Sequence, residues 1–406
     1  MFRFQPDSAA HRSEIIRSGG PRFLFAILTL AALSTLQGAG QTPQPGQSDY
    51  QVKVDCESAD RVVTVRFGPH GARVERDVST RLMPVDINGP HGIVFSPDRE
   101  FYYVSIGHGR PNGSAWKYRA GDDAVLGHVD LGMFPATEDV TPDGNFLYVV
   151  NFNLHGDMVP SSVSVVDTHL MMEVARIPTC TMPHGSRINA DGTAHYSACM
   201  MDDLLVEIDP RRMKVARSFR VTPGKEQAFE GLPRSDSAQH ASHAMDHGSE
   251  PPKAGDNSCQ PTWAQPSADG ARVFVACNKS SEIVEVDAES WKLVRRIPAG
   301  PGVYNLGVTR DGKLLIATNK RGPSVSIFDV KTAKELARLP TKRKVVHGVA
   351  VSPDNLYAFV TVEGLGSEPG TLEVIDLIAL KTVATLDLPE QAAGIDFWKI
   401  EPSKSP

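Results

Sequence analysis

The sequence predicts an all-β protein, a seven-bladed β-propeller of four-stranded blades in which N-terminal strands complete the C-terminal blade. Three observations support this fold class. A unit of roughly forty residues recurs along the chain, as in propeller blades. Each unit contains short β-rich runs separated by tight turns. The mature part of the chain shows little of the 3.6-residue periodicity of helices.

Seven segments open the repeats in a similar way. They are HGIVFSPDRE (91–100), ATEDVTPDGN (136–145), HGSRINADGT (184–193), TWAQPSADGA (262–271), YNLGVTRDGK (304–313), HGVAVSPDNL (347–356) and AGIDFWKI (393–400). The first six carry Asp at the eighth position, usually followed by Gly or a polar residue, as a hairpin turn requires. A second β-rich run follows each turn, then a third that tends to end in Asp, and a fourth. The pattern predicts four strands in each blade.

The seventh repeat contains only its first strand, residues 393–400, before the chain ends. Residues 50–58, 61–67 and 72–78 resemble a second, third and fourth strand without a first. We therefore expect the two ends of the propeller to share one blade. Such closure removes the free sheet edges that would otherwise pair with other chains.

The run LYVVN (147–151), third strands such as SVSVVD, and SPDG-type turns resemble the YVTN-type seven-bladed propeller repeat family. The resemblance covers nearly the whole mature chain and implies the propeller fold. It leaves the function open, because related propellers range from lactonases to haem and copper oxidoreductases.

The N-terminal region predicts export from the cytoplasm. An apolar run, residues 23–36, follows three arginines and precedes small residues, which is typical of a signal peptide over residues 1–40. An uncleaved anchor is the alternative. We expect a linker over 41–48, the propeller over 49–400 and a tail over 401–406. The mature protein would then be periplasmic or secreted, with no membrane span and with disulfides permitted.

Composition argues against one class of partner. The 406 residues carry a formal net charge of −6, so a nucleic-acid partner held by a basic surface is not expected. The sequence also lacks a P-loop, a dinucleotide-binding glycine pattern, a CxxCH haem motif and a Gly-x-Ser-x-Gly elbow.

Residues 222–258 interrupt the repeats. This segment is rich in Gly, Pro, Ser, Asp and His, and we expect an exposed loop. It contains His240, His243, Met245 and His247, a ligand set that favours copper over calcium or magnesium. A polar insertion that happens to be rich in histidine is the alternative interpretation.

The residues that begin the seven first strands should meet at one mouth of the central channel. They are His91, Ala136, His184, Thr262, Tyr304, His347 and Ala393. The three histidines could converge on copper, zinc or iron. They could equally satisfy loop carbonyls, or bind a small anion or a sugar. Polar residues that we expect to line the channel beyond them are Glu138, Asp139, Arg187, Gln265 and Asp396.

Four of the five cysteines flank two equivalent hairpins. In each hairpin one Cys precedes the first strand and the other ends the second, which makes disulfides Cys180–Cys199 and Cys259–Cys277 plausible. Other pairings, or a thiolate metal site between the two blades, are the alternatives. Cys56 is left over, and we expect it to be a buried small residue.

These observations leave three functions open. The first is a secreted propeller that binds a small molecule, a metal such as copper, or a protein partner on its channel face. The second is a copper-dependent oxidoreductase that uses His91, His184 and His347. The third is a lactonase-like hydrolase, in which Glu138, Asp139 and Asp396 would surround a divalent ion and an activated water.

Overall fold

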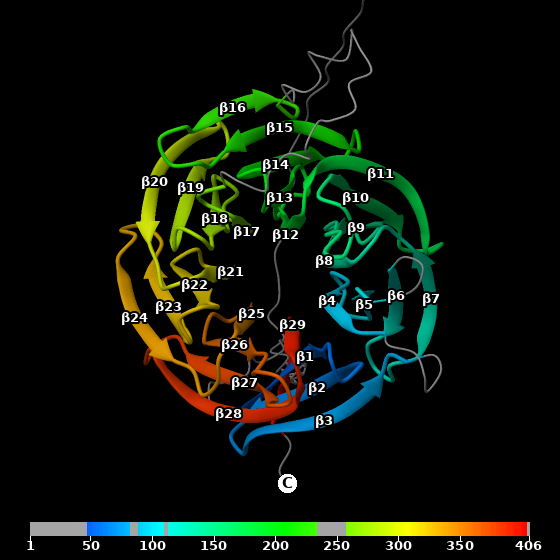
Figure 1. Ribbon diagram of the computed structural model, residues 1–406. Helices are drawn as coiled ribbons and strands as arrows, with labels where there is room; N and C mark the ends of the chain where they lie inside the picture. Colours follow the sequence, from blue (N-terminus) through cyan, green and yellow to red (C-terminus); the bar gives the residue numbers. More distant parts are fainter. Residues whose placement is uncertain (1–46, 82–87, 109–112, 234–256, 404–406) are drawn as a thin grey trace, which may run out of the picture. The chain divides into compact units, whose positions relative to one another are not determined.

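The computed structural model describes residues 47–81, 88–108, 113–233 and 257–403. Within these ranges every regular element is a β-strand, and the strands form seven antiparallel sheets arranged in a ring (Figure 1). The predicted fold class is therefore confirmed. The described residues hold no helix that is long and apolar enough to cross a membrane.

The blades are numbered along the chain, and each is given from the channel outwards. Blade 1 contains β4 (Pro90–Phe95), β5 (Phe101–Ile106), β6 (Ser114–Arg119) and β7 (Val125–Asp130). Blade 2 contains β8 (Pro135–Val140), β9 (Phe146–Asn151), β10 (Pro160–Asp167) and β11 (Met172–Thr181). Blade 3 contains β12 (Pro183–Ile188), β13 (His195–Cys199), β14 (Leu204–Asp209), β15 (Lys214–Arg220) and β16 (Gln227–Glu230).

The remaining blades follow the same plan. Blade 4 contains β17 (Pro261–Pro266), β18 (Arg272–Cys277), β19 (Glu282–Asp287) and β20 (Lys292–Pro298). Blade 5 contains β21 (Val303–Val308), β22 (Leu314–Asn319), β23 (Ser324–Asp329) and β24 (Glu335–Pro340). Blade 6 contains β25 (Val346–Val351), β26 (Tyr357–Val362), β27 (Pro369–Asp376) and β28 (Lys381–Glu390). Blade 7 contains β29 (Ala392–Pro402), β1 (Ser48–Cys56), β2 (Arg61–Gly68) and β3 (Gly71–Ser79).

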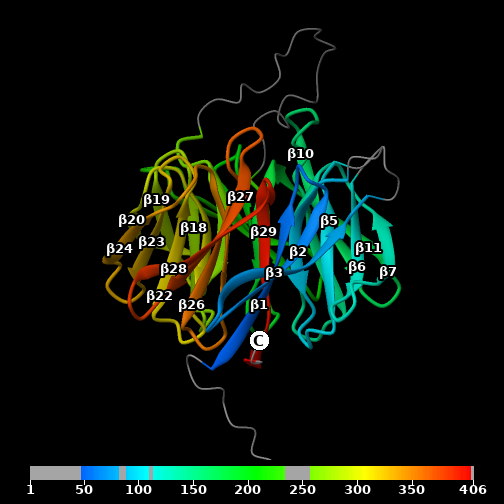
Figure 2. The same ribbon diagram turned by 90° about the horizontal axis from the view of Figure 1, so that it is seen from below.

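The two ends of the propeller share blade 7, as the sequence predicts. Strand β29 pairs antiparallel with β1, so that Tyr50 lies opposite Ile400 and Val54 opposite Ile395 (Figure 2). Tyr50, Val54 and Ile395 belong to one buried apolar cluster. Hydrogen bonds and apolar burial therefore act together to close the ring.

The six Asp-containing turns have a common backbone conformation. The residue after the Asp has a positive φ in every case, with values of +63° at Arg99, +76° at Gly144, +72° at Gly192, +72° at Gly270, +70° at Gly312 and +63° at Asn355. The Asp side chain fixes the turn; Asp143, for example, accepts hydrogen bonds from the Thr141 hydroxyl and the Asn145 N–H. This is the physical basis of the repeated Asp-Gly signal.

Steric crowding explains why glycine follows each channel histidine. A Cβ on Gly92 would lie 2.1 Å from the Ala136 carbonyl oxygen of the next blade, and a Cβ on Gly185 would lie 2.4 Å from the Thr262 carbonyl oxygen. The innermost strands thus approach one another too closely for a side chain at this position. The His-Gly dipeptide places an imidazole at the channel mouth while it allows this approach.

We expect Gly92→Ala to lower the free energy of unfolding by about 3 kcal/mol, because the new methyl group must displace the backbone of β8. Gly121→Ala is the matched control, since a Cβ there would meet no atom within 4 Å. Chemical denaturation of both variants checks the prediction. Equal stabilities would show that the innermost strands can move apart without cost.

The 222–258 segment departs from the expected loop at one place. Residues 227–230 form β16, which pairs with β15 and gives blade 3 a fifth strand. Arg296 of blade 4 forms an ion pair of 2.6 Å with Glu226 and holds the start of this strand. The sequence signal was weak because four residues, QAFE, are too short to show alternation. His240, His243, Met245 and His247 lie outside the described residues.

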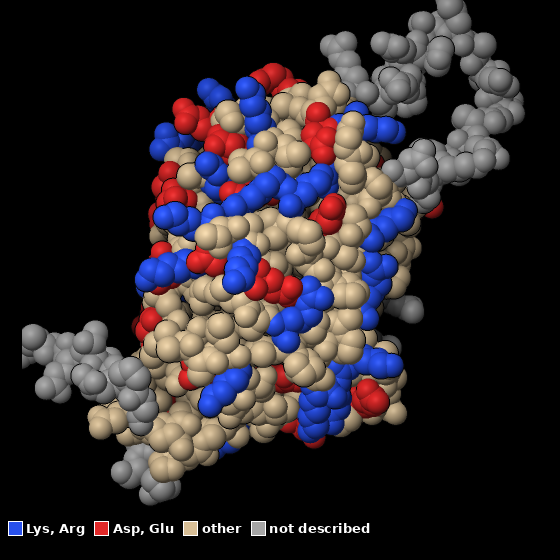
Figure 3. Space-filling view, turned by 90° about the vertical axis from the view of Figure 1, so that its left-hand side faces the viewer, with Lys and Arg blue, Asp and Glu red and all other residues tan. Residues whose placement is uncertain are grey.

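The outer surface carries charges of both signs. On the face that Figure 3 shows, basic and acidic side chains are interspersed. Arg338 pairs with Glu335 on β24, the outermost strand of blade 5. Exposed pairs of this kind contribute little to stability. The mixed charges of this face are those of an ordinary solvated surface.

Both predicted disulfides are present. Cys180 is bonded to Cys199 and Cys259 to Cys277, while Cys56 is a free buried cysteine. In each pair the second cysteine ends the second strand of its blade and lies opposite a proline that begins the first. The two bonds therefore fix the start of the first strand in blades 3 and 4, at the mouth of the channel.

Candidate functional site

Four aromatic side chains form a closed cycle around the channel axis. They come from the starts of four innermost strands: His91 on β4, His184 on β12, Tyr304 on β21 and His347 on β25. The ring centroids lie 6.1 Å apart for His91 and His184, 5.4 Å for His184 and Tyr304, 4.9 Å for Tyr304 and His347, and 5.7 Å for His347 and His91. The structure thus brings together the three histidines of blades 1, 3 and 6.

Hydroxyl groups of neighbouring strands fix the backbone of this cycle. The Thr137 hydroxyl donates to the His184 carbonyl oxygen at 2.5 Å, and the Thr318 hydroxyl donates to the His347 carbonyl oxygen at 2.8 Å. The Thr262 hydroxyl donates to the Tyr304 carbonyl oxygen at 2.8 Å. The aromatic side chains are therefore presented from backbone positions that are held by adjacent blades.

His184 has partners on both ring nitrogens. Its Nδ1 lies 2.9 Å from the Thr262 carbonyl oxygen, which can only accept, so Nδ1 carries the proton. Burial, reinforced by His91, lowers the pKa of His184 to about 3, so the imidazole is neutral at pH 7. Its Nε2 therefore accepts a hydrogen bond from the Tyr304 hydroxyl at 3.1 Å.

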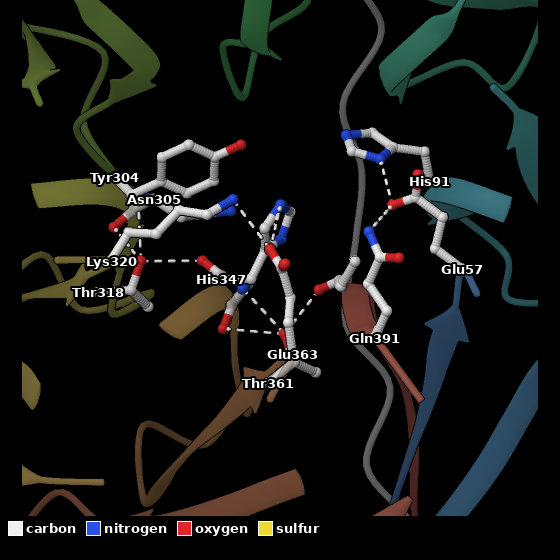
Figure 4. Close-up of polar contacts among 12 residues, drawn as sticks. Glu57, His91, Tyr304, Asn305, Thr318, Lys320, His347, Thr361, Glu363 and Gln391 are labelled. Carbon is white, nitrogen blue, oxygen red and sulfur yellow. Dashed lines mark hydrogen bonds and ion pairs between the residues drawn. The ribbon is translucent and has the colours of Figure 1, made fainter. Parts of the chain in front are cut away.

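His91 is oriented by a carboxylate. Its Nδ1 lies 2.9 Å from Glu57 Oε2, and Glu57 also binds His108 Nε2 at 2.7 Å and the Gln391 amide at 2.9 Å. Figure 4 shows Glu57 between His91 and Gln391, with the second nitrogen of His91 turned towards the axis. That nitrogen, Nε2, is buried and has no hydrogen-bond partner. A carboxylate on one nitrogen of a histidine whose other nitrogen is free is typical of metal ligands.

Glu57 and His108 were not singled out in the sequence. Burial opposes the ionisation of Glu57, but His91 and His108 outweigh it and lower the pKa of Glu57 to about 2. Their position is the sequence signal that points to them, because both lie within two residues after the ends of second strands, β1 and β5. These strands end at the same mouth as the channel histidines.

We expect Glu57→Gln to lower the pKa of His108, because the hydrogen bond from Glu57 is the largest cause that raises it. An NMR titration of the histidine ring resonances checks this. Glu363→Gln is the control, since this change removes a carboxylate from blade 6 and should leave His108 unaltered. An unchanged His108 titration in Glu57→Gln would contradict the assigned contact.

His347 completes the cycle on the opposite side. Its Nε2 lies 3.7 Å from Glu363 Oε1, and Glu363 forms an ion pair of 2.9 Å with Lys320 (Figure 4). Its Nδ1 is buried and has no hydrogen-bond partner. Burial, together with the positive charge of Lys320, lowers the pKa of His347 well below its usual value, so this imidazole is also neutral.

A small cavity lies among these residues. Its volume is about 20 Å³, and its lining includes His91, Glu138, Asn305 and His347. Each of these four residues has buried polar atoms without a hydrogen-bond partner. Buried polar groups are almost always paired, so a group of unpaired ones around one cavity calls for a water or an ion. The volume is sufficient for one such species.

The side chains do not yet form a finished metal site. Among the described residues, no three His, Cys, Asp or Glu side chains lie where they could hold one metal ion together. An ion would have to draw the side chains inwards from their present positions. The donors fit a transition metal in their chemistry, because neutral imidazole and carboxylate are its usual ligands.

The other predicted lining residues hold neighbouring blades together. Asp139 Oδ2 accepts a hydrogen bond of 2.8 Å from the Ile188 N–H of blade 3, and Asp396 Oδ2 accepts one of 2.8 Å from the Phe95 N–H of blade 1. Arg187 lies over the ring of Trp263, with its guanidinium carbon 4.6 Å from the ring centroid. These groups serve as contacts between blades.

A larger hollow opens at the opposite end of the first strands. Its volume is about 320 Å³, and its lining includes Arg99, Gln265, Arg310 and Asp396. The Gln265 amide already has hydrogen-bond partners there. Its oxygen accepts a hydrogen bond from the Trp263 indole, and its nitrogen donates one to the Pro266 carbonyl oxygen. Arg99 donates to the Phe397 carbonyl oxygen. Most polar side chains that line this hollow thus already have partners within the chain.

Comparison with known proteins adds evidence on the fold. No family model matches this chain, and no curated protein matches it either. A structure of Kuenenia stuttgartiensis hydrazine synthase is 21% identical, with a TM-score of 0.59, and the match covers 79% of this chain and 92% of that one.

Two further structures are similar over most of their length. A functionally unknown protein from Desulfotomaculum acetoxidans DSM 771 is 14% identical, with a TM-score of 0.62 and coverage of 86% of this chain and 98% of that one. A protein from Bacteroides fragilis NCTC 9343, provisionally named a 6-phosphogluconolactonase, is 14% identical, with a TM-score of 0.63 and coverage of 88% and 100%. At these identities the likeness shows the propeller fold alone.

Proposed function

We propose that this protein is an extracytoplasmic β-propeller that binds one transition-metal ion, copper in the first place, at the mouth of its central channel. One observation carries the proposal. His91, His184 and His347 come from three separate blades to one cycle, and ring nitrogens of His91 and His347 are buried there without partners. Imidazole is a preferred ligand of copper, zinc and iron, and copper(II) binds most tightly in the divalent series.

The size of the cavity favours binding over catalysis. A volume of about 20 Å³ holds a single ion or water, whereas sites for organic molecules measure several hundred Å³. A lactone would therefore not fit beside the histidines. The carboxylates of Asp139 and Asp396, which a lactonase-like hydrolase would need, accept hydrogen bonds from backbone N–H groups of neighbouring blades.

The proposed location is supported by the cysteines. Two disulfides persist in oxidising compartments and are rare in the cytosol. The apolar run over residues 23–36, which is typical of a signal peptide, is consistent with export.

Equilibrium metal binding tests the proposal. Protein produced through a secretory route should bind close to one copper ion per chain by elemental analysis after dialysis. We expect His91→Ala/His184→Ala/His347→Ala to bind copper at least 100-fold more weakly, because it removes every imidazole of the cycle.

The matched control is His70→Ala/His128→Ala/His169→Ala, which removes three exposed histidines and should bind copper like the wild type. Copper bound equally well by the channel variant would move the site to the loop with His240, His243, Met245 and His247. A wild-type protein that binds no copper, iron or zinc after loading would refute the proposal.

A further inference from the structure

We infer that Glu138 and Asn305 provide oxygen ligands, so that the ion lies inside the channel cavity in a mixed nitrogen–oxygen site with His91 and His347. The inference rests on the proposed function and makes it more specific. It requires the ion to draw His91, His347 and Glu138 inwards, because among the described residues no three such side chains lie where they could hold one ion together. It assigns His184 to a positioning role, and it replaces a site of three imidazoles by one of two imidazoles, a carboxylate and an amide oxygen.

Glu138 is the strongest reason for this assignment. The residue is 1% exposed, lines the cavity, and neither carboxyl oxygen has a hydrogen-bond partner. Burying a carboxyl group without any partner is costly, and such groups are paired or coordinate metals in folded proteins. The neighbouring Asp139 has the same side-chain chemistry, yet both of its oxygens accept backbone hydrogen bonds. Glu138 thus lacks the close backbone donors that hold Asp139, which leaves its oxygens available to a bound ion.

Within the described residues no basic side chain contacts the Glu138 carboxyl group, and only the charge of Arg187 acts on it without a hydrogen bond. Arg187, which also lines the cavity, donates to the Ser186 carbonyl oxygen at 2.8 Å and lies over Trp263. Asp55, another buried acid whose oxygens have no partner, lies behind Gly394 on the cavity wall. Neither acid has a contacting cationic partner in the described part of the chain, so a divalent cation in the cavity would add a positive charge beside them.

Asn305 brings a neutral oxygen to the same place. It is 4% exposed, and its Oδ1 is buried without a partner. Its backbone N–H donates to the Thr318 hydroxyl at 3.0 Å, and the same hydroxyl donates to the carbonyl of His347. One threonine therefore holds both Asn305 and His347 beside the cavity.

His184 is unsuited to the ligand set. Its Nδ1 is bonded to the Thr262 carbonyl and its Nε2 to the Tyr304 hydroxyl, so no nitrogen is free. The unpaired imidazole nitrogens belong to His91 and His347. The role of His184 is to hold Tyr304 between blades 3 and 5 at the channel mouth.

Two glycines shape the cavity wall. Gly92 and Gly394 line the cavity, and a Cβ on Gly394 would lie 2.7 Å from an Asp55 carboxyl oxygen. A side chain at either position would meet the backbone of a neighbouring innermost strand, so these glycines allow the strands that carry the donors to approach one another. The mixed donor set suits a divalent ion such as Cu²⁺, Zn²⁺ or Fe²⁺ better than Cu⁺, which prefers sulfur ligands.

Pulsed EPR of the copper(II)-loaded wild type tests the inference without any substitution. We expect spin-echo modulation from two coordinated imidazoles. A spectrum from three imidazoles would overturn the mixed site and leave the proposed function standing, with a water in the cavity. No bound copper at all would refute the proposed function itself.

Glu138→Gln provides the second test, because it keeps the size of the side chain and removes only the charge. We expect copper(II) affinity, measured by competition with a chromogenic chelator, to fall at least 100-fold, more than the 10- to 100-fold that outer-shell groups cost. Asp139→Asn, the adjacent matched control, should bind with wild-type affinity if it folds. His184→Gln should lose less than tenfold.

Circular dichroism confirms folding before each titration. Unchanged affinity and an unchanged EPR spectrum in folded Glu138→Gln would overturn the inference. A loss of more than 100-fold in folded His184→Gln would also do so, because it would make His184 a ligand.

Discussion

Removing both disulfides should lower the free energy of unfolding by about 6 kcal/mol, the largest stability loss that we expect from any change outside the apolar core. Each bond closes a short loop, with sequence separations of 19 and 18 residues, and a loop of this size is worth on the order of 3 kcal/mol. The first bond joins the end of β11 in blade 2 to the end of β13 in blade 3, whereas the second lies within blade 4, between the residues before β17 and the end of β18. We therefore expect their contributions to add.

Replacing Cys180, Cys199, Cys259 and Cys277 by alanine, followed by urea denaturation, measures this loss. Cys56→Ala is the matched control, because it removes a buried sulfur but no cross-link. We also expect the variant without disulfides to weaken metal binding, since Cys180 lies four residues before His184. A stability loss no larger than that of Cys56→Ala would show that the hairpins hold their shape unaided.

His195 should make the propeller sensitive to acid. The residue is fully buried on β13, its two ring nitrogens have no partner, and burial, reinforced by Arg187, lowers its pKa to about 3. In the unfolded chain its pKa returns to about 6.5. Below pH 6.5 the unfolded chain therefore binds one proton more than the folded one, and stability falls as the pH falls.

We expect His195→Phe to remove the part of this sensitivity that His195 contributes, while buried His184 and His347 keep theirs. Between pH 7 and pH 4 the wild type should lose on the order of 3 kcal/mol more stability than the variant. Phe keeps a planar ring against Tyr148, whose centroid lies 5.1 Å from that of His195. Urea denaturation at both pH values gives the difference, and His70→Phe, at an exposed position, serves as control. Equal pH dependence in wild type and His195→Phe would contradict the burial of a neutral imidazole.

The fold could be predicted from the sequence because its determinants are local and repeated. Asp143 and Gly144 specify a turn through their own backbone and side-chain hydrogen bonds, so the same letters recur wherever the turn does. The disulfides follow from the same register, since Cys180 and Cys199 hold fixed places relative to a hairpin. Ring closure could be predicted because the C-terminal repeat has only a first strand and the N-terminal segment has only the other three.

The candidate site could be predicted only in part. The repeat register placed His91, His184 and His347 at equivalent positions, but it could not show which nitrogens have partners. That depends on contacts between residues far apart in the sequence, such as Glu57 with His91 and Thr262 with His184. For the same reason the sequence did not separate Glu138, which is unpaired, from Asp139, which binds the next blade.

Diffraction from copper-loaded crystals on both sides of the copper absorption edge tests the central claim most directly, because it locates the metal without any substitution. We predict one anomalous peak per chain, inside the channel among His91, His347 and Glu138. Copper found only outside the channel would contradict the account. So would the absence of any copper peak in crystals soaked with excess copper.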